Sequence, residues 1–560
     1  MKKVLVSILL IVISLYSGWS NDPTVNTQVS LGSSDKAIPK VRFGSDNFYY
    51  ITWFQSNTSG YALYAQKYDE NGNEQWTVGG VVVSDEPQET WLTDYDMEIH
   101  PEGGFVVVFP DIRDGGFNVQ AARMDGNGVA LWGEDGTSMT TAADGYNVTP
   151  KVEVMPNGTS VVTWIDANND AVVLQAISSD GNKLWEDGVT LYNSAYTSTN
   201  PDLIVCDEES FYIEWSKQTG PFYSPVRNIW LQRMDLEGNF LWAEDLALTT
   251  QAGIKGWTTI HTDKDKEQGA IISWHDDRDY DDIDRAYVQC VNKDGVTRFE
   301  EGGFLLDATS AYHSWDPICD TDDENNLFIA WKRSDAAYQS YNSVHAQKFI
   351  YADFVWEPNG NAITEESNLL ASHNSCGVVD GKFFVGLERY SFGNFMYTDI
   401  TGVLLDDNCD NVWGDEVYIN NTASSVVHLD NTCWNNNKMV LAWEDDRNDE
   451  KQIFMQNINL DGTIGGGVGV DENTPESISL TAYPNPFNPV CSINFNLPSS
   501  ESLNIRVFNT NGEIVNSLNN VNYKSGINSV KLDMKEFNSG TYFVSVDGSV
   551  NQMIKIVLLK

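Results

Sequence analysis

The stretch YITWFQSNTSGYALYAQKYDENGNEQW, Tyr50 to Trp76, decides the fold, because versions of it return about every 55 residues through most of the chain. Its Trp53 has seven counterparts: Phe109, Trp164, Trp215, Trp274, Trp331, Leu387 and Trp443. A second aromatic residue follows in every copy except the last, which has Ile464: Trp76, Trp132, Trp185, Trp242, Phe299, Trp356 and Trp413. A near-constant period of this length, filled with strands, is typical of a repeat architecture.

Each repeat has the content of four short antiparallel strands. In the third copy, residues 161–164 and 172–175 are short runs rich in β-branched residues, and residues 168–170 supply the turn between them. A Gly/Asn turn follows at residues 180–182, where positive φ angles cost little. The sequence therefore predicts an all-β fold: an eight-bladed β-propeller of four-stranded blades over residues 24–468.

The two ends of the repeat region predict how the ring closes. Residues 28–31 resemble the fourth strand of a blade, although they precede the first blade. The eighth copy runs into three glycines, residues 465–467, after its third strand. We therefore expect the N-terminal segment to complete the last blade, which removes the exposed edges of an open stack.

Residues 1–20 have the pattern of a secretory signal peptide. Two lysines precede an apolar run at residues 4–15, and the small residues Ser17, Gly18 and Ser20 follow. The apolar run is too short to span a bilayer, and no later stretch is long and apolar enough to do so. The sequence predicts an exported chain without a transmembrane segment.

Composition excludes one class of partner. The chain has 34 basic and 80 acidic residues and a formal net charge of -46. Residues 478–560 are close to neutral, so the excess of acid lies in the repeats. A surface this negative repels nucleic acid and anionic lipid, and we expect no nucleic-acid binding. The seven cysteines have no metal-binding or redox spacing and are interpreted as structural thiols or an occasional bridge.

After a linker at residues 469–477, the composition changes and the period stops. Residues 478–560 predict a small Ig-like β-sandwich of about seven strands. Its distinctive features are YPNPFNP at residues 483–489, the Asn511-Gly512 turn, SGTYFV at 539–544 and KIVLLK at 555–560. The residues that carry the motif are Tyr483, Pro484, Asn485, Pro486, Gly512, Gly540 and Lys555.

This C-terminal pattern resembles the sorting domain of type IX secretion in Bacteroidota-like bacteria. The resemblance implies that the outer-membrane type IX secretion machinery is a partner. It also implies that the protein is delivered to the cell surface or secreted. The alternative is an accessory Ig-like module, as in flagellar hook-capping proteins, which share the Pro-Asn-Pro start.

The turns of the repeats resemble those of known propeller enzymes. Segments of the form Asp-x-x-Gly-x-x-x-Trp, at residues 69–76 and 235–242, are similar to the tryptophan-docking turns of eight-bladed pyrroloquinoline-quinone dehydrogenases. Residues 178–185 are similar to the Asp-box turns of sialidases. The resemblance implies turns that lock neighbouring blades. No adjacent cysteine pair and no arginine triad can be assigned, so no catalytic residue is predicted.

Two series of side chains are candidates for ligand binding on one face of the propeller. The first is an acid–base pattern after the repeat's aromatic residue: Asp111 and Arg113; Asp276, Asp277 and Arg278; Asp445, Asp446 and Arg447. The second consists of aromatic residues predicted just ahead of the first strand of five consecutive blades: Trp91, Tyr146, Tyr196, Trp257 and Trp315. Rings beside carboxylates favour sugar binding. The alternatives are turn caps for the first series and plugs between blades for the second.

One acidic turn is a candidate calcium site. Asp320, Asp322 and Glu324 place carboxylates at alternate positions, and calcium gathers six to eight oxygen ligands. The alternative is a solvated turn, because the glycine and distal glutamate of an EF-hand loop are missing.

These patterns lead to one functional hypothesis and two alternatives. The sequence predicts a secreted or cell-surface, non-enzymatic propeller that binds an extracellular glycan or protein. The alternatives are a glycan-active hydrolase of the sialidase-like propeller type and a scaffold with calcium-stiffened turns.

Overall fold

The computed structural model describes residues 18–88, 95–221, 225–262, 269–278, 283–391, 394–447, 450–466, 480–483, 485–497, 501–510, 512–524, 526–547 and 551–560. Within these ranges the regular structure consists of β-strands. The chain divides into two compact units, Met1–Gly467 and Val468–Lys560. No helix that could cross a membrane occurs in the described part of the chain.

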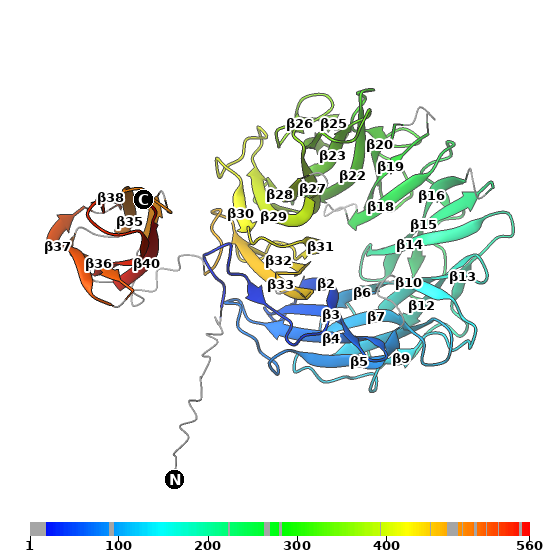
Figure 1. The fold of residues 1–560 in the computed structure, drawn as a ribbon. Helices are drawn as coiled ribbons and strands as arrows, with labels where there is room; N and C mark the ends of the chain where they lie inside the picture. The colour runs from blue at the N-terminus through cyan, green and yellow to red at the C-terminus, as the bar shows by residue number, and fades with distance from the viewer. Residues whose placement is uncertain are drawn as a thin grey trace, which may run out of the picture. The chain divides into compact units, whose positions relative to one another are not determined.

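The described strands of the first unit form eight antiparallel sheets, arranged radially like the blades of a propeller (Figure 1). Blade 1 comprises β2 (Lys36–Phe43), β3 (Tyr49–Asn57), β4 (Gly60–Tyr68) and β5 (Val81–Gln88); blade 2 comprises β6 (Asp96–Ile99), β7 (Phe105–Asp111), β8 (Asn118–Met124) and β9 (Thr137–Ser138); blade 3 comprises β10 (Asn147–Val154), β11 (Ser160–Asp166), β12 (Ala171–Ile177) and β13 (Val189–Leu191). Blade 4 comprises β14 (Thr197–Val205), β15 (Ser210–Thr219), β16 (Val226–Asp235) and β17 (Leu246–Ala247); blade 5 comprises β18 (Lys255–Thr262), β19 (Ala270–Asp276), β20 (Arg285–Val291) and β21 (Phe304–Leu305). Blade 6 comprises β22 (Tyr312–Thr321), β23 (Leu327–Asp335), β24 (Asn342–Ile350) and β25 (Asp353–Phe354), with β26 (Asn361–Ala362) also paired to β24; blade 7 comprises β27 (Leu369–Val379), β28 (Lys382–Ser391), β29 (Asn394–Leu405) and β30 (Val417–Asn420).

Blade 8 confirms the predicted closure. Its sheet has the order β1-β33-β32-β31, from β31 (Val426–Asn431), β32 (Lys438–Asp445), β33 (Gln452–Asn459) and the N-terminal β1 (Thr27–Gln28). Thr27 pairs with Met455 and Gln28 with Phe454. One hydrophobic cluster joins Val41 of blade 1 to Val440 of blade 8. The last blade therefore packs against the first, and its outermost strand comes from the start of the chain.

The first aromatic series is the core of the blades. Each member lies in the second strand of its blade and is buried. Trp53, Trp274, Trp331 and Trp443 have no exposed surface. Side chains this large and this well buried supply much of the packing energy of the blades.

The second aromatic series docks each blade onto the next. Six indoles donate a hydrogen bond from Nε1 to a carbonyl oxygen in the following blade: Trp76 to Gly126 (3.3 Å), Trp132 to Ser179 (2.9 Å), Trp185 to Leu236 (2.9 Å), Trp242 to Lys293 (3.0 Å), Trp356 to Asp407 (2.9 Å) and Trp413 to Leu460 (3.0 Å). Each acceptor lies in the turn that follows the third strand of its blade. We call these contacts the docking bonds, and they agree with the blade-locking role implied by the resemblance.

The second unit contains two sheets around its own core. Their orders are β34-β35-β38 and β37-β36-β39-β40. The strands are β34 (Leu480–Tyr483), β35 (Val490–Leu497), β36 (Glu501–Asn509), β37 (Ile514–Tyr523), β38 (Gly526–Asp533), β39 (Gly540–Asp547) and β40 (Asn551–Leu558). Buried residues from both sheets, including Ile493, Val507 and Val544, form one hydrophobic cluster.

The predicted motif residues lie at the borders of these strands. Tyr483 ends β34, Gly540 begins β39 and Gly512 has a φ of 81° in the turn between β36 and β37. Asn485 precedes Pro486 through a cis peptide bond, and its side chain bonds to the backbone of β40, with Nδ2 donating to the Lys555 carbonyl (3.0 Å) and Oδ1 accepting from the Val557 amide (2.8 Å). Pro484 lies outside the described residues.

Candidate functional site

The first strand of almost every described blade contains a β-bulge at the same place. The register shifts within β2, β10, β14, β18, β22, β27 and β31. A bulge inserts an extra residue, bends the strand and changes the direction of a side chain. These first strands are the innermost strands of the blades, so the bulges redirect side chains near the axis of the ring.

Six of the bulges hold a non-glycine residue in a left-handed conformation. The residues and their φ angles are Ile38 (50°), Thr149 (47°), Asn200 (50°), Trp257 (51°), Asp316 (52°) and His428 (55°). This conformation is rare for β-branched or bulky side chains, and each instance costs about 1–2 kcal/mol. We call these six residues the bulge set. Strain repeated around the axis indicates that the position of these side chains matters more than local stability.

Three members of the bulge set line one cavity of about 600 Å³, here called the inner cavity. It lies between the first strands of blades 3, 4 and 5. Its lining residues are Thr149, Lys151, Asn200, Pro201, Asp202, Arg227, Ile254, Gly256, Trp257, Thr258, His275, Asp277 and Asp284. Trp257 is 73% exposed. An indole held in this way by a strained bulge offers a flat apolar surface to a ligand.

Burial shifts the pKa values of two carboxyl groups in or beside the inner cavity, Asp202 and Glu214. It raises the pKa of Asp202, although Lys151 Nζ lies 3.9 Å from the Asp202 carboxylate. Burial also raises the pKa of Glu214 well above its usual range, and the charge of Asp202 adds to this effect. The Thr258 hydroxyl of the cavity wall donates to Glu214 Oε2 (3.4 Å). Burial therefore favours the protonated form of these two carboxyl groups.

His275 is the imidazole of the inner cavity. Burial lowers its pKa, and the Asp316 carboxylate, 3.6 Å from Nδ1, only partly opposes this effect. The neighbouring Asp284 has a lowered pKa, because His313 and Trp315 donate hydrogen bonds to it. The ring of His275 is therefore neutral near pH 7, whereas Asp284 is ionised.

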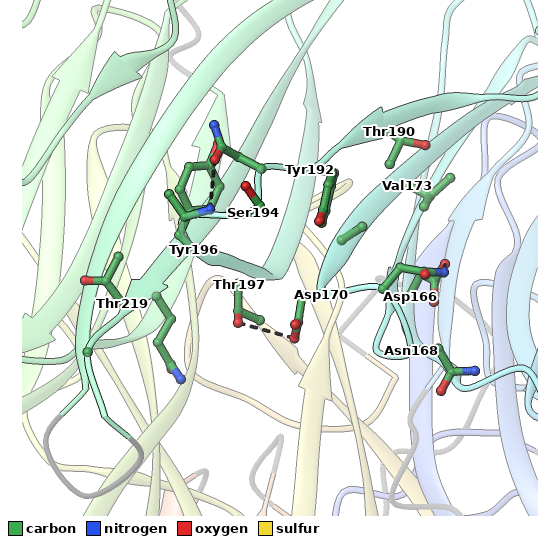
Figure 2. A pocket seen from close by; sticks show the side chains of 16 residues that line it. Asp166, Asn168, Asp170, Val173, Thr190, Tyr192, Ser194, Tyr196, Thr197 and Thr219 are labelled. Carbon is green, nitrogen blue, oxygen red and sulfur yellow. Dashed lines mark hydrogen bonds between the residues drawn. The ribbon is translucent and has the colours of Figure 1, made fainter.

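A second cavity, here called the outer groove, has a volume of about 830 Å³ and lies between blades 3 and 4. Its residues come from the β11–β12 turn, the connection between β13 and β14, and the end of β15. Figure 2 shows Tyr192 and Tyr196 beside hydroxyl, amide and carboxylate side chains. The Thr197 hydroxyl donates to Asp170 (3.3 Å). Tyr192 is 57% exposed, and Lys217 Nζ lies 4.9 Å from the centre of the Tyr196 ring.

The inner cavity and the outer groove share a wall. Strand β14 contributes Thr197 to the groove and Asn200 to the cavity. Arg227 of the cavity donates from Nη2 to Gln218 Oε1 of the groove at 2.9 Å. Both cavities open on the side of the propeller that carries the turns between second and third strands. We call this side the bulged side.

The structure distributes the predicted aromatic residues among different environments. Trp91 lies outside the described residues. Tyr146 is 48% exposed and packs edge-on against Phe117, and Tyr196 lines the outer groove. Both precede the first strand of their blade, as predicted.

The prediction that Trp257 and Trp315 precede their strands is wrong, because they lie inside β18 and β22. These strands begin earlier than the sequence indicated, and their bulges interrupt the alternation. Trp315 is half-buried, stacks on His313 with 4.7 Å between ring centres and donates to Asp284 (2.8 Å). Trp257, in contrast, lines the inner cavity.

The acid–base series forms internal pairs. Asp111, Asp276 and Asp445 are buried and bonded to Arg113, Arg278 and Arg447 respectively. Each arginine also reaches a further group: Arg113 the Asp135 carbonyl, Arg278 the Gly302 carbonyl and Arg447 the Asn420 side chain. These contacts support the turn-cap alternative.

The remaining two acids of the series differ from the buried ones. Asp277 and Asp446 accept backbone N–H groups of Ile254 (2.6 Å) and Ser425 (2.8 Å). Asp277 also lines the inner cavity. Ligand binding by this series stays a prediction, and Asp277 is the member placed beside a cavity.

The three candidate calcium ligands do not converge. Asp320 accepts the Val378 amide of the next blade (2.8 Å), whereas Asp322 accepts the amides of Glu324 (3.0 Å) and Asn326 (2.8 Å) in its own turn. Throughout the described residues, no three His, Cys, Asp or Glu side chains form a metal-binding group. The reason is the alternation of β22, which directs Asp320 toward the neighbouring blade and leaves Asp322 to cap the turn.

Sequence reasoning missed most of the lining of both cavities, including Tyr192, Asn200 and Thr149. A signal was present for the bulges. Four members of the bulge set precede proline: Ile38, Thr149, Asn200 and Asp316. Proline cannot donate to a strand ladder, so its recurrence at one position of a repeat marks an irregular strand.

Several solved structures are similar to part of the chain. A polysaccharide lyase of family PL25, an ulvan lyase, matches with a TM-score of 0.46 and 9% identity over 80% of this chain and 99% of that chain. The α-L-arabinanase of Penicillium chrysogenum matches with a TM-score of 0.30 and 12% identity over 57% and 94%. The β-propeller domain of the trilobed protease from Pyrococcus furiosus matches with a TM-score of 0.35 and 8% identity over 77% and 97%. Because these TM-scores lie below 0.5, no conclusion about this chain is drawn from the matches.

The C-terminal unit has a family match. No curated protein matches the chain in sequence. Residues 481–560 match the family described as secretion system C-terminal sorting domain. This range contains the motif that begins at Tyr483 and continues to the last residue. The protein is therefore a β-propeller followed by a C-terminal sorting domain of the type IX secretion system, which implies interaction with that machinery and export.

Proposed function

We propose that the propeller binds an extended, neutral polysaccharide on its bulged side after export to the cell surface or the medium. The sorting domain supplies the route of export. The inner cavity and the outer groove supply the binding surface.

The exposed indole of Trp257 is the observation that carries this proposal. Sugar rings present C–H groups on their faces, which stack on aromatic rings, while their hydroxyl groups need hydrogen-bonding partners. Around Trp257 the inner cavity offers the hydroxyl of Thr258, the amide of Asn200 and the carboxylate of Asp277. An apolar face surrounded by such partners suits a sugar better than a purely apolar ligand.

The connection between the two cavities favours a polymer over a single sugar. Each cavity has a volume in the range that takes a ligand of drug size. The side chains of Arg227 and Gln218, joined by one hydrogen bond, form the wall between the inner cavity and the outer groove. A chain of sugars that contacts Trp257 can continue over this wall to Tyr192. Binding then increases with the length of the chain, because more sugars find partners.

Charge favours a neutral ligand over a polyanion. The formal net charge of the whole chain is -46, and Asp277 and Asp284 add negative charge beside Trp257. A uronate or sulfate polymer would be repelled at a distance, although Lys151 and Arg227 lie in the same cavity.

Isothermal titration of the exported protein with neutral and acidic polysaccharides tests the proposal. The panel contains β-glucan, mannan, xylan and arabinan against alginate and pectate. We expect binding to at least one neutral polymer, and Trp257→Ala to weaken it about tenfold or more, equal to about 1.4 kcal/mol. Tyr338→Ala is the matched control, because Tyr338 is 82% exposed and lines neither cavity.

Two outcomes would contradict the proposal. If no neutral polysaccharide binds above the level of an unrelated acidic protein, glycan recognition is rejected. If Trp257→Ala binds as the unchanged protein does, the inner cavity is rejected as the site.

Cleavage of the same polysaccharide is a second candidate function, favoured by one observation. Asp202, with a raised pKa, and His275, with a lowered pKa, line the same cavity. A carboxyl group with a raised pKa and an imidazole with a lowered pKa are the kinds of group that serve as general acid and general base. Release of new reducing ends from a bound polysaccharide, and its loss in Asp202→Asn and His275→Ala, would establish cleavage. Binding without release leaves the protein a binding module.

A further inference from the structure

The docking bonds have a second shared feature beside the indole hydrogen bond. The rings of five of the six docking tryptophans, all except Trp356, cover a glycine in the turn of the next blade. A Cβ at Gly181 would lie 2.7 Å from Trp132, and one at Gly462 would lie 2.8 Å from Trp413. Both glycines have positive φ angles, 86° and 82°. A docking position is therefore recognised by an indole, a carbonyl oxygen and a turn residue with positive φ, which is Cys409 (64°) in the turn that receives Trp356 and glycine in the other five.

The turn of blade 1 offers the same position without a donor from the eighth repeat. That repeat has Ile464 where the others have an aromatic residue. The turn itself is complete, with Gly72 at a φ of 80° and the Glu70 carbonyl as acceptor.

Trp19 fills this eighth position from the start of the chain. Its Nε1 donates to the Glu70 carbonyl (2.8 Å), and a Cβ at Gly72 would lie 2.8 Å from its ring. The side chain is 8% exposed and belongs to the cluster that contains Val41 and Val440. Trp19 therefore has the geometry of the six docking tryptophans. It comes from the N-terminal segment, whereas the others come from the blade that precedes their acceptor.

The backbone around Trp19 is also held at the junction of the first and last blades. The Trp19 amide donates to the Asn71 carbonyl (3.0 Å). The Ser20 carbonyl accepts from Gln456 Nε2 of blade 8 (2.8 Å). The ring of Tyr49 packs edge-on against the indole, with 6.1 Å between ring centres. These contacts join blade 1 to blade 8 on the side opposite the bulges.

We propose that the signal peptide is removed on the N-terminal side of Trp19, so that the mature protein keeps this residue as its seventh docking tryptophan. The small residues Gly18 and Ser20 would by themselves favour cleavage after Ser20. Hydrolysis there would discard the indole and leave Gly72 uncovered. In our proposal, signal peptidase cleavage hydrolyses a peptide bond that precedes Trp19. Water supplies the hydroxyl of the new carboxyl terminus and a proton of the new amino terminus.

Sequencing of the N-terminus of the exported protein, together with its intact mass, tests this proposal. We expect the mature chain to begin at Trp19 or at an earlier residue. A mature chain that begins at Ser20 or later would overturn it. The result does not depend on whether the propeller binds a polysaccharide.

Thermal unfolding of exported variants gives a second test. Trp19→Ala is compared with Trp413→Ala, which removes the docking tryptophan of the preceding blade. We expect both to lower Tm, by about 3–5 °C. A Trp19→Ala protein that melts at the temperature of the unchanged protein, beside a destabilised Trp413→Ala, would show that the ring does not use Trp19 and would refute the proposal.

Discussion

The two sides of the propeller use tryptophan in opposite ways. On the side of the docking bonds, Trp185 is buried, stacks on Phe211 and donates to a carbonyl of the next blade. On the bulged side, Trp257 is 73% exposed, and its backbone is strained. The docking contacts repeat from blade to blade with little change. The side chains of the bulge set differ in every blade.

This difference separates stability from recognition. A contact that recurs among the repeats has the same role wherever it occurs. Here that role is to hold neighbouring blades together. A backbone feature that recurs with different side chains positions those side chains for something other than packing. Repetition identifies the scaffold, and variation within it identifies the candidate site.

The largest expected effect is a loss of stability when a docking tryptophan is removed. Trp185→Ala removes a buried indole and its hydrogen bond, so we expect the free energy of unfolding to fall by about 3–5 kcal/mol. Trp185→Phe keeps most of the packing and loses only the bond to the Leu236 carbonyl, which costs about 1 kcal/mol. Urea unfolding measures both. Equal losses in the two variants would contradict the role given to packing.

The next effect concerns Trp257 on the bulged side, where one substitution is expected to remove binding and relieve backbone strain. We expect Trp257→Gly to abolish polysaccharide binding and to be more stable than Trp257→Ala by about 1 kcal/mol, because glycine accepts the φ of 51° without strain. Titration calorimetry and urea unfolding of the two variants check this. If Trp257→Gly were the less stable of the two, the bulge would not be strained.

A smaller effect sharpens the comparison within the bulged side. We expect Tyr192→Ala to weaken binding of long oligosaccharides about threefold to tenfold, equal to about 1 kcal/mol, and to leave short ones unaffected. The reason is that only a long chain reaches the outer groove. A series of oligosaccharides of increasing length, titrated into the variant and into Tyr338→Ala, measures it. Equal loss at every length would place Tyr192 in the primary site.

The buried carboxyl groups predict a dependence of stability on pH. The fold raises the pKa of Glu214, so it favours the protonated form. The stabilising contribution is complete below the ordinary pKa and is lost as the pH rises through the raised value. Glu214→Gln keeps an uncharged side chain, and we expect it to raise the stability at pH 8 by about 1 kcal/mol or more and to leave it unchanged at pH 4. The exposed Glu237→Gln is the control.

The smallest expected effect concerns calcium. Because Asp320 and Asp322 bond to different backbone segments, we expect added calcium or a chelator to leave Tm unchanged within about 1 °C. Differential scanning calorimetry measures it. A rise of several degrees with calcium, lost in Asp322→Asn, would restore the calcium-stiffened scaffold.

The period of the aromatic residues was sufficient to predict the blades, because a buried ring in each second strand leaves a regular trace in the sequence. Closure by residues 28–31 was also predictable, since a strand without a partner stood at one end and a missing strand at the other. The docking role of Trp19 was not predictable. Trp19 and Glu70 are brought together by closure of the ring, and no local sequence pattern marks their contact.

The candidate site was less accessible to sequence reasoning for a physical reason. Trp257 occupies the bulge position of its strand, whereas Trp315 lies one residue before it, so one is exposed and the other is bonded to Asp284. The local direction of a bulged strand decides between these outcomes, and β18 carries no proline to reveal its bulge. The charged pairs that end in Arg113 and Arg278 looked like a binding rim, because sequence does not show that their acids are buried.

The strand that completes blade 8 has a consequence for how the protein is made. The Ile453 amide bonds to Ser30 across a sequence separation of 423 residues, so this contact forms only after nearly the whole propeller has been delivered. Until then β1 has no partner strand, and the edge of blade 8 that β1 will cover is open. Two incomplete chains that meet at this stage can exchange their first strands. Slow delivery of the last blade therefore favours domain-swapped dimers.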